Sequence, residues 1–432
     1  MDNMFQDWKD RSIRFLLWSQ KYTKTDMLYL ARGGFSSAII QVAGITVSLL
    51  LAVTVSHFVP KESYGVYKYI LSIVGILSLF SLNSIGSAVF QSAAQGFDGV
   101  LARAFWDNIR WSVAVFAGTL LLATYYFFMG NNTLGAGILI GGALSPILAS
   151  ASLFSSFLGG KKDFYRQALY GVIDVTVPVL IFIGIVMLTS NPIVLVTTFF
   201  ITNTVAALYF YRRTIEVYRS HVHIHDENML SYSKHLSFMG IINGVANYID
   251  QVLIFHFLGG AQLAVYNFAI AIPDQLKSPV KNIASILQPR FVEYSAREIQ
   301  KNIGRKILLM FVGSVGVTVL YIIVAPDIFH MLFPKYAEAA KYSQLYALWM
   351  LTIAADPMAT YLVARKLTSE LYVNTTVYSV FQLVGITVGV LLWGIAGVII
   401  ARIVTRIAML ATNVLLYRRA IKREIALDTT HV

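Results

Sequence analysis

Long apolar stretches, separated by short polar segments, recur along the whole chain. Each stretch holds about 20 residues, which in a helix is enough to cross a bilayer core of about 30 Å. The pattern predicts an all-α polytopic membrane protein rather than a soluble fold with an anchor. We place twelve transmembrane helices near residues 33–57, 65–89, 106–129, 134–158, 165–188, 192–211, 236–258, 262–286, 304–325, 338–362, 372–393 and 396–417.

The polar turn between the first two spans is repeated in the second half of the chain. His57–Ser72 reads HFVPKESYGVYKYILS, and at an offset of 199 residues His256–Ala271 reads HFLGGAQLAVYNFAIA. Both copies close one apolar span and open the next. We therefore predict two pseudo-symmetric six-helix lobes, related by an axis along the membrane normal.

The predicted layout has five segments. They are an amphipathic N-terminal segment (1–32), an N-lobe (33–211), an inter-lobe linker (212–235), a C-lobe (236–417) and a basic tail (418–432). The first segment mixes basic and aromatic side chains, as an interfacial helix on anionic lipid does. Loops on the side of the N-terminus carry 25 Lys and Arg residues, whereas the opposite loops carry 2. This excess places both termini and the linker in the cytoplasm.

Composition and charge exclude several classes of function. The chain is 57% hydrophobic and 13% charged, against about 25% charged in soluble domains. The loop asymmetry explains most of the net charge of +12, so a nucleic-acid partner is not expected. There are no cysteines for disulfides or thiolate sites, and no Gly-x-x-x-x-Gly-Lys loop for ATP hydrolysis. His221, His223 and His225 alternate in the linker, where a solvated loop is favoured over a metal site.

Polar side chains inside the predicted spans mark candidate sites, because a mid-span charge costs about 2.5–3.5 kcal/mol on insertion scales. The eighth span carries four of them on one helix face. That face either lines a central cavity, where its lysines would hold an anionic group, or extends its lysines to the cytoplasmic interface. The four residues are Asn267, Asp274, Lys277 and Lys281. Lys68 is equivalent to Asn267 in the second span, and either lines the cavity or reaches the outer headgroups.

The twelfth span carries Arg402 and Arg406 on one face. Guanidinium groups suit diphosphate oxygens, so both arginines are candidates for cargo contact. The alternative is a fixed ion pair with Asp174, Asp250 or Asp356.

The acidic residues at depth are candidates for ion coupling. Asp250 lies on a polar stripe of the seventh span with Asn247 and is the first candidate, because desolvation raises the pKa of a lone carboxyl. The alternative for Asp250 is a structural salt bridge. Asp174, Asp274 and Asp356 are further candidates for coupling or pairing, each with a proline close by.

The turn into the second helix resembles that of a known family. From Thr46 to Ala93, an apolar span is followed by VPKESYGVY and then by ILSIVGILSLFSLNSIGSA. This is similar to the polysaccharide and oligosaccharide (O-antigen type) flippases of the multidrug/oligosaccharidyl-lipid/polysaccharide (MOP) superfamily. In those proteins an acidic residue and a Tyr-Gly-x-Tyr-like turn open the second helix. The second passage, Asn247–Pro273, departs from this pattern because residues 263–266 read LAVY, without glycine or acid.

The resemblance implies a MATE-like fold and a lipid cargo. The cargo would be an oligosaccharide linked to undecaprenyl diphosphate, moved from the cytoplasmic to the outer leaflet of the bacterial inner membrane by alternating access. An H⁺ or Na⁺ gradient or the membrane potential would drive it, without a cofactor or a catalytic step. The implied partners are membrane lipids and other membrane proteins of polysaccharide assembly.

Two other functions fit a polytopic bundle. A MATE-like drug or cation exporter needs an acidic cavity, whereas the deep residues here are mixed to basic. A membrane-embedded glycan polymerase or glycosyltransferase usually places catalytic groups in a sizeable outer loop. The longest outer loop here is Pro326–Ala337, so the sequence favours the flippase.

Overall fold

The computed structural model describes residues 27–218, 226, 228–276, 296–365 and 368–430, and every regular element in these ranges is a helix. The elements are α2 (Met27–Phe58), α3 (Lys61–Ser78), α4 (Ile85–Ala94), α5 (Val100–Trp111), α6 (Val113–Phe128), α7 (Asn132–Ala151), α8 (Leu153–Gly160), α9 (Phe164–Leu188), α10 (Pro192–Tyr218), α11 (Met229–Leu258), α12 (Gly260–Gln275), α14 (Ala296–Leu332), η1 (Pro334–Tyr336), α15 (Ala339–Ala347), η2 (Leu348–Ala355), α16 (Asp356–Ala364) and α17 (Thr368–Thr430). The all-α fold class is confirmed.

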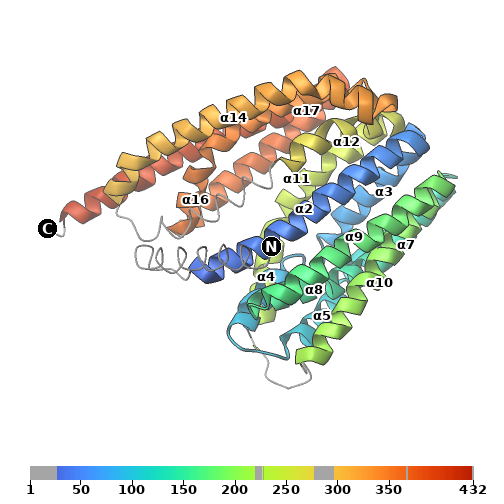
Figure 1. The fold of residues 1–432 in the computed structure, drawn as a ribbon, viewed down its shortest axis with the longest axis horizontal. Helices are drawn as coiled ribbons and strands as arrows, with labels where there is room; N and C mark the ends of the chain where they lie inside the picture. Colours follow the sequence, from blue (N-terminus) through green and yellow to red (C-terminus); the bar gives the residue numbers. More distant parts are fainter. Residues whose placement is uncertain (1–26, 219–225, 227, 277–295, 366–367, 431–432) are drawn as a thin grey trace, which may run out of the picture.

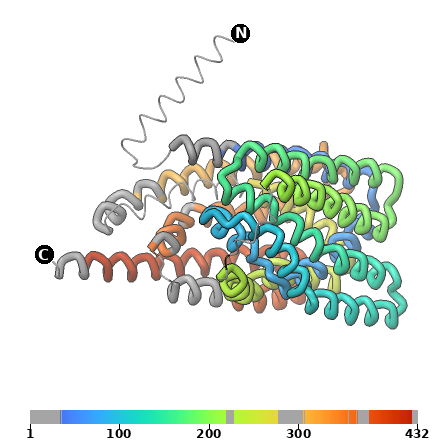
Figure 2. Tube along the Cα trace, turned by 90° about the horizontal axis from the view of Figure 1, so that it is seen from below, coloured from blue at the N-terminus to red at the C-terminus, as the bar shows by residue number. Residues whose placement is uncertain are grey.

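The helices form two bundles that meet along α3. Helices α2 to α10 pack largely on one another and make the N-terminal bundle, while α11 to α17 make the C-terminal bundle. Contacts between the bundles join α3 to α11 and α12, α4 to α11, and α2 to η1. The helices run roughly parallel to the long axis of the molecule (Figure 2). The bundles lie close together where α3 and α12 begin and diverge toward the other end (Figure 1), so we call the former the closed end.

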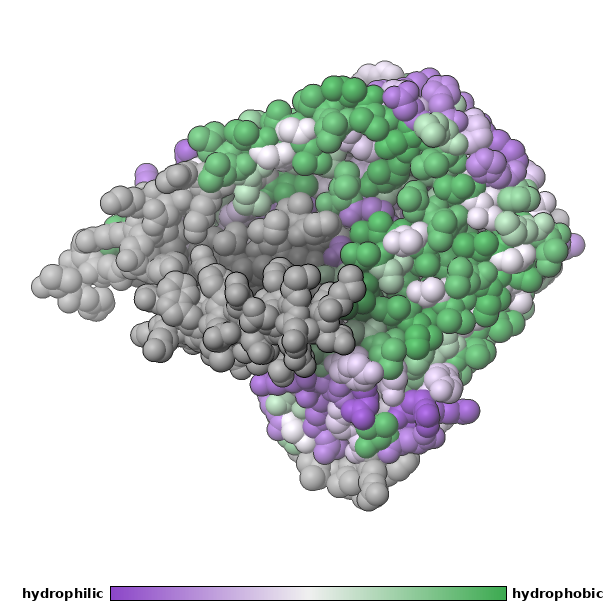
Figure 3. Space-filling view, in the orientation of Figure 1, coloured by the Kyte–Doolittle hydropathy of each residue, from purple (hydrophilic) through white to green (hydrophobic). Residues whose placement is uncertain are grey.

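The outer faces of the helices are strongly apolar. Leu121 and Phe128 on α6 are 73% and 87% exposed, and similar side chains cover α9 and α14. In the space-filling view a broad hydrophobic belt lies between hydrophilic ends (Figure 3). Eight helices in the described ranges are long and apolar enough to cross a membrane. The chain is therefore a multi-pass membrane protein.

The remaining predicted spans fall on shorter or broken helices. Residues 65–89 cover α3 and α4, residues 262–286 begin with α12 and continue beyond the described part, and residues 338–362 are divided into α15, η2 and α16. The last two spans are the arms of α17, which turns back at Trp393 and Gly394, where the φ of Gly394 is 58°. Glycine adopts this backbone conformation without steric cost. The count of twelve stays a prediction.

Helices α3 and α12 occupy the centre of the molecule. They begin at Lys61 and Gly260, which are separated by the 199-residue offset of the repeat. Every residue from Leu263 to Ile270 of α12 is buried, and α3 buries eight residues along its length. Because both helices are largely enclosed, polar side chains such as Ser72 and Asn267 are buried inside the protein rather than exposed to lipid.

Candidate functional site

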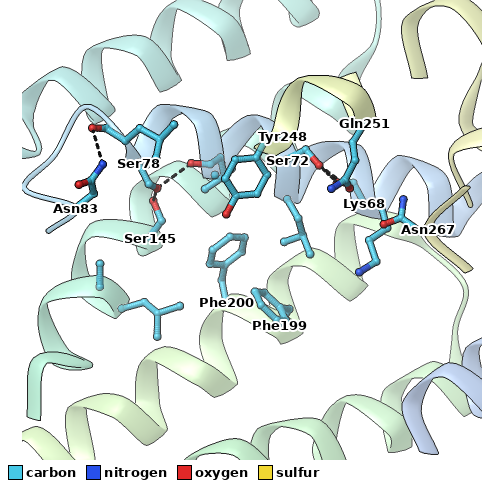
Figure 4. Close-up of a pocket in the computed structure, with 16 residues that line it drawn as sticks. Lys68, Ser72, Ser78, Asn83, Ser145, Phe199, Phe200, Tyr248, Gln251 and Asn267 are labelled. Atoms are coloured by element: carbon cyan, nitrogen blue, oxygen red, sulfur yellow. Dashed lines mark hydrogen bonds between the residues drawn. The ribbon is translucent and has the colours of Figure 1, made fainter. Parts of the chain in front are cut away.

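A cavity of about 530 Å³ lies between the two bundles. Its wall is built by α3, α7 and α10 of the N-terminal bundle and by α11 and α12 of the C-terminal bundle, as Figure 4 shows. This volume falls within the range of about 300–1,000 Å³ that small-molecule sites occupy. The residues that line it are Lys68, Leu71, Ser72, Val74, Gly75, Ser78, Leu79, Asn83, Ser145, Leu148, Ala149, Phe199, Phe200, Tyr248, Gln251 and Asn267.

The two repeat-equivalent candidates, Lys68 and Asn267, both line this cavity (Figure 4). Lys68 is the one charged side chain among the lining residues of the described chain. Its Nζ lies 5.5 Å from the ring centroid of Tyr64 and 6.0 Å from that of Tyr67, and no described carboxylate forms an ion pair with it. Asn267 donates from Nδ2 to the carbonyl of Leu263 at 2.9 Å. The wall therefore offers a cation whose contacts are aromatic rings rather than an anion.

Hydroxyl, amide and aromatic groups form the rest of the polar wall. Ser72 donates from Oγ to Oε1 of Gln251 at 2.9 Å, which joins α3 to α11 across the two bundles. Further along α3, the hydroxyls of Ser78 and Ser145 are 3.3 Å apart. The ring of Tyr248 covers the backbone of α3 beside the phenylalanines of α10 (Figure 4). Such a wall can hydrogen-bond hydroxyl groups and cover apolar faces of a ligand.

The closed end is held by hydrogen bonds and an ion pair between the bundles. Glu62, in the first turn of α3, accepts from the backbone N–H of Gly260 through Oε1 at 3.2 Å. Its Oε2 accepts from the N–H of Ala261 at 2.8 Å. Beside it, Nζ of Lys61 lies 2.5 Å from Oε1 of Glu338. These contacts tie α3 to the start of α12 and to the segment after η1.

Two further contacts at the closed end involve α2. Lys335 of η1 donates from Nζ to the carbonyl of His57 at 2.6 Å, and Ser56 donates from Oγ to the carbonyl of Leu332 at 3.0 Å. A Cβ built on Gly65 would lie 1.9 Å from the carbonyl oxygen of Gly260, so the backbones of α3 and α12 touch here. The bundles cannot separate at this end without breaking all of these contacts.

A second polar cluster lies inside the C-terminal bundle and away from the cavity wall. Asp250 on α11 is fully buried, and its Oδ2 lies 2.5 Å from the guanidinium of Arg402 on α17. The hydroxyl of Tyr266 also donates to Oδ2 of Asp250. Arg402 donates to the hydroxyl of Tyr346 at 3.3 Å, and that hydroxyl donates to Oδ1 of Asp274 at 2.9 Å. The cluster connects α11, α12, α15 and α17.

Comparison with known families identifies the chain. The sequence model of the family described as polysaccharide biosynthesis protein matches residues 54–306, which is more than half of the chain. The chain belongs to the polysaccharide biosynthesis protein family. This confirms the resemblance that the turn at Glu62 indicated. No curated protein sequence matches this family member.

Solved structures share the fold of this polysaccharide biosynthesis protein. An inward-facing multidrug resistance MATE family transporter of the MOP superfamily matches with a TM-score of 0.73 and 15% identity, over 91% of this chain and 100% of that one. An outward-facing MATE transporter gives 0.62 and 13%, over 92% and 96%. A MOP superfamily transporter from Pyrococcus furiosus Vc1, described as having a binding pocket of reverse polarity, gives 0.60 and 14%, over 91% and 95%. The MOP fold expected from the sequence is confirmed.

The structure of this family member places the arginine candidates outside the cavity wall. Arg402 forms the ion pair with Asp250, which is one of the two readings that the sequence left open. The guanidinium of Arg406 lies 5.6 Å from the ring centroid of Trp349, and its Nη1 lies 3.6 Å from Sδ of Met409. Both arginines therefore pack against the C-terminal bundle and do not line the cavity.

The other candidates are dispersed. Asn247 is exposed on α11, whereas Asp174 on α9 and Asp356 at the start of α16 are half-buried. Asp274, predicted on the cavity face with Asn267, instead accepts from Tyr346. Lys277, Lys281, the N-terminal segment 1–26 and the linker histidines lie outside the described residues.

Sequence reasoning missed two kinds of residue in this polysaccharide biosynthesis protein. The aromatic wall formed by Phe199, Phe200 and Tyr248 had no signal, because aromatic residues are common throughout the spans. Glu62 was noted only as part of a motif, although one signal was present. It is an acid in one repeat copy and has no acidic counterpart at position 261 of the other.

Proposed function

We propose that this protein moves a lipid-linked oligosaccharide across the membrane, with the diphosphate and sugars in the cavity and the lipid tail in the bilayer. Family membership supports a role in polysaccharide biosynthesis. The cavity volume of about 530 Å³ suits a polar head group rather than a long polyisoprenoid chain. The lipid would remain between the diverging helices, on the bilayer side.

One observation carries the choice of an anionic cargo. Lys68 is the sole charge on the described cavity wall and has no carboxylate partner there. A cation at membrane depth needs a counter-charge or water, because an unpaired charge there is costly. A diphosphate supplies that counter-charge, and the serines, amides and aromatic rings of the same wall suit a glycan. A cationic drug would meet repulsion from Lys68, which argues against the exporter.

The mechanism we propose is alternating access. In the orientation predicted from the basic loops, the closed end faces outward, so this structure corresponds to the state open to the cytoplasm. Cargo enters between the diverging bundles and meets Lys68, after which the closed-end contacts break and the other end closes. Net movement would be outward across the bacterial inner membrane, coupled to an H⁺ or Na⁺ gradient. Because Asp250 is already paired with Arg402 and Asp274 accepts from Tyr346, we propose that the coupling carboxylate is one of the two half-buried acids, Asp174 or Asp356.

The test replaces Lys68 with glutamine and measures transport in proteoliposomes. The probe is a polyisoprenyl diphosphate carrying a fluorescent disaccharide, and a membrane-impermeant quencher reports which leaflet it occupies. A charge-assisted hydrogen bond contributes about 1.5–3 kcal/mol, so Lys68→Gln should slow transport roughly ten- to hundredfold. Lys68→Arg is the matched control that keeps the charge, and it should retain most of the rate.

Two outcomes would reject the proposal. Wild-type transport of the diphosphate probe by Lys68→Gln would remove the lysine from cargo binding. Faster transport of a fluorescent quaternary ammonium by Lys68→Gln, with no transport of the diphosphate probe by either protein, would instead support a cation exporter.

A further inference from the structure

The hydrogen bond between Glu62 and Ala261 joins two positions that are equivalent in the repeat. The two residues are separated by 199 positions, which is the offset at which the copies align. In a pair of bundles related by a twofold axis, a residue touches its own equivalent only at the axis. The contact between Glu62 and Ala261 therefore marks where the pseudo-twofold axis leaves the closed end.

The carboxylate of Glu62 acts as a helix cap for the opposite bundle. The first N–H groups of an α-helix lack partners within the helix, and the N-terminus carries partial positive charge. Gly259, the N-cap residue of α12, provides no side-chain cap, and Glu62 accepts from the N–H groups of both residues that follow it. Pro60, the N-cap residue of α3, likewise provides no side-chain cap. The start of α12 is therefore capped by a side chain of the other bundle. The start of α3, its equivalent, receives no side-chain cap from its own N-cap residue.

We infer that Glu62 is the latch of the closed end, that is, the side chain that holds the two bundles together there. An acidic residue at the equivalent position, 261, would do the same. A single acid placed at either position would cap the helix that begins in the other bundle. The latch is satisfied by one carboxylate, which explains why the second repeat copy has alanine where the first has glutamate.

The geometry also explains why both copies cannot carry the acid. The Oε2 of Glu62 already lies 2.8 Å from the backbone nitrogen of Ala261. A second carboxylate at position 261 would face the first at the axis, and like charges at close range repel. The departure of the second copy from the family pattern is therefore a consequence of where the copies meet.

The experiment follows opening of the closed end without any cargo. The natural chain has no cysteine, so Ser56→Cys introduces a single thiol. Ser56 is fully buried at the closed end, and the change is nearly isosteric. The reference protein, purified and reconstituted in nanodiscs, is treated with a maleimide, and the labelling rate reports how often the closed end opens. The inference rests on the proposed alternating access, but this measurement depends on neither cargo nor orientation.

Three variants are compared in the Ser56→Cys background. Glu62→Ala removes the latch and should raise the labelling rate at least fivefold. Ala261→Glu, with Glu62 kept, should also raise it, because two carboxylates face each other. The exchange that combines Glu62→Ala with Ala261→Glu should return the rate to within twofold of the reference, since the new carboxylate can cap α3.

Asp327→Ala is the matched control, because it removes an exposed acid from the last turns of α14, near the closed end. Asp327 forms no ion pair in the part of the chain that the structure describes, so labelling should change less than twofold. If an alanine variant fails to fold, the nearly isosteric Glu62→Gln carries the test and should raise the rate between two- and fivefold. An unchanged rate in Glu62→Ala or Glu62→Gln overturns the latch, as does an equal rise in Asp327→Ala. An exchange variant that labels as fast as Glu62→Ala overturns the equivalence of the two positions.

Discussion

The two copies of the repeat have the same backbone and different chemistry. Helices α3 and α12 begin 199 residues apart, and equivalent residues of both line the cavity. The first copy supplies charges that face the other bundle, Lys61 and Glu62 at the closed end and Lys68 in the cavity. Near the second copy the charge lies inside its own bundle, where Asp250 accepts a hydrogen bond from Tyr266. In the function that we propose, the first copy serves closure and cargo binding, and the residues around the second copy serve internal stability.

The largest effect should come from disturbing the backbone contact at the axis. In Gly65→Ala the new Cβ would lie 1.9 Å from the carbonyl oxygen of Gly260, and a backbone atom cannot move aside as a side chain can. The closed end should then fail to form, so transport of the diphosphate probe should fall to background and labelling of Ser56→Cys should become rapid.

Gly184→Ala is the control for this change. Gly184 lies in α9, where an added Cβ has nothing within 4 Å, so transport should stay within twofold of the wild type. Normal transport by Gly65→Ala would mean that the bundles need not touch at the axis.

Breaking the buried ion pair of the second copy should cost stability. Asp250→Asn leaves the guanidinium of Arg402 buried without its counter-charge, which typically costs about 3–5 kcal/mol. Thermal unfolding in detergent should show a clear fall in Tm. Replacing both partners, with Asp250→Leu and Arg402→Met, should recover most of the loss, because an apolar pair needs no counter-charge.

This prediction distinguishes a structural pair from a coupling site. An Asp250→Asn variant with the wild-type Tm but no transport would make Asp250 a coupling residue instead. Asp174→Asn is the comparison, since Asp174 is only half-buried and forms no ion pair in the described part of the chain. Its change should lower Tm by less than that of Asp250→Asn.

Much of the fold follows from the sequence because bilayer thickness fixes helix length. The apolar periodicity predicted the all-α class, and the echo at 199 residues predicted that α3 and α12 are equivalent. The same offset identified Lys68 and Asn267 as a pair, and both line the cavity. These inferences needed only the spacing of residues along the chain. In a transmembrane helix this spacing determines the depth of a residue in the bilayer and the side of the helix on which it lies.

The partners of the deep charges were not determined by spacing. The sequence left both cargo contact and an ion pair with an acid open for Arg402, because the choice depends on which helices are neighbours. Asp274 and Asn267 share a helix face, yet Asp274 contacts Tyr346 of α15 while Asn267 lines the cavity. Helix packing decides such contacts, and residues far apart in sequence supply them.

The smallest effect should come from moving the cavity charge across the axis. Lys68→Asn alone should lose roughly ten- to hundredfold in transport, because the counter-charge for the diphosphate disappears. Adding Asn267→Lys restores a cation to the same cavity from the opposite bundle. The exchanged protein should recover to within about tenfold of the wild-type rate in the proteoliposome assay. Full recovery is not expected, since Asn267 is buried and a lysine there pays a desolvation cost. If the exchanged protein transports no better than Lys68→Asn, transport depends on which bundle carries the lysine. The cavity would then lack the twofold symmetry of the two helices, α3 and α12, that line it.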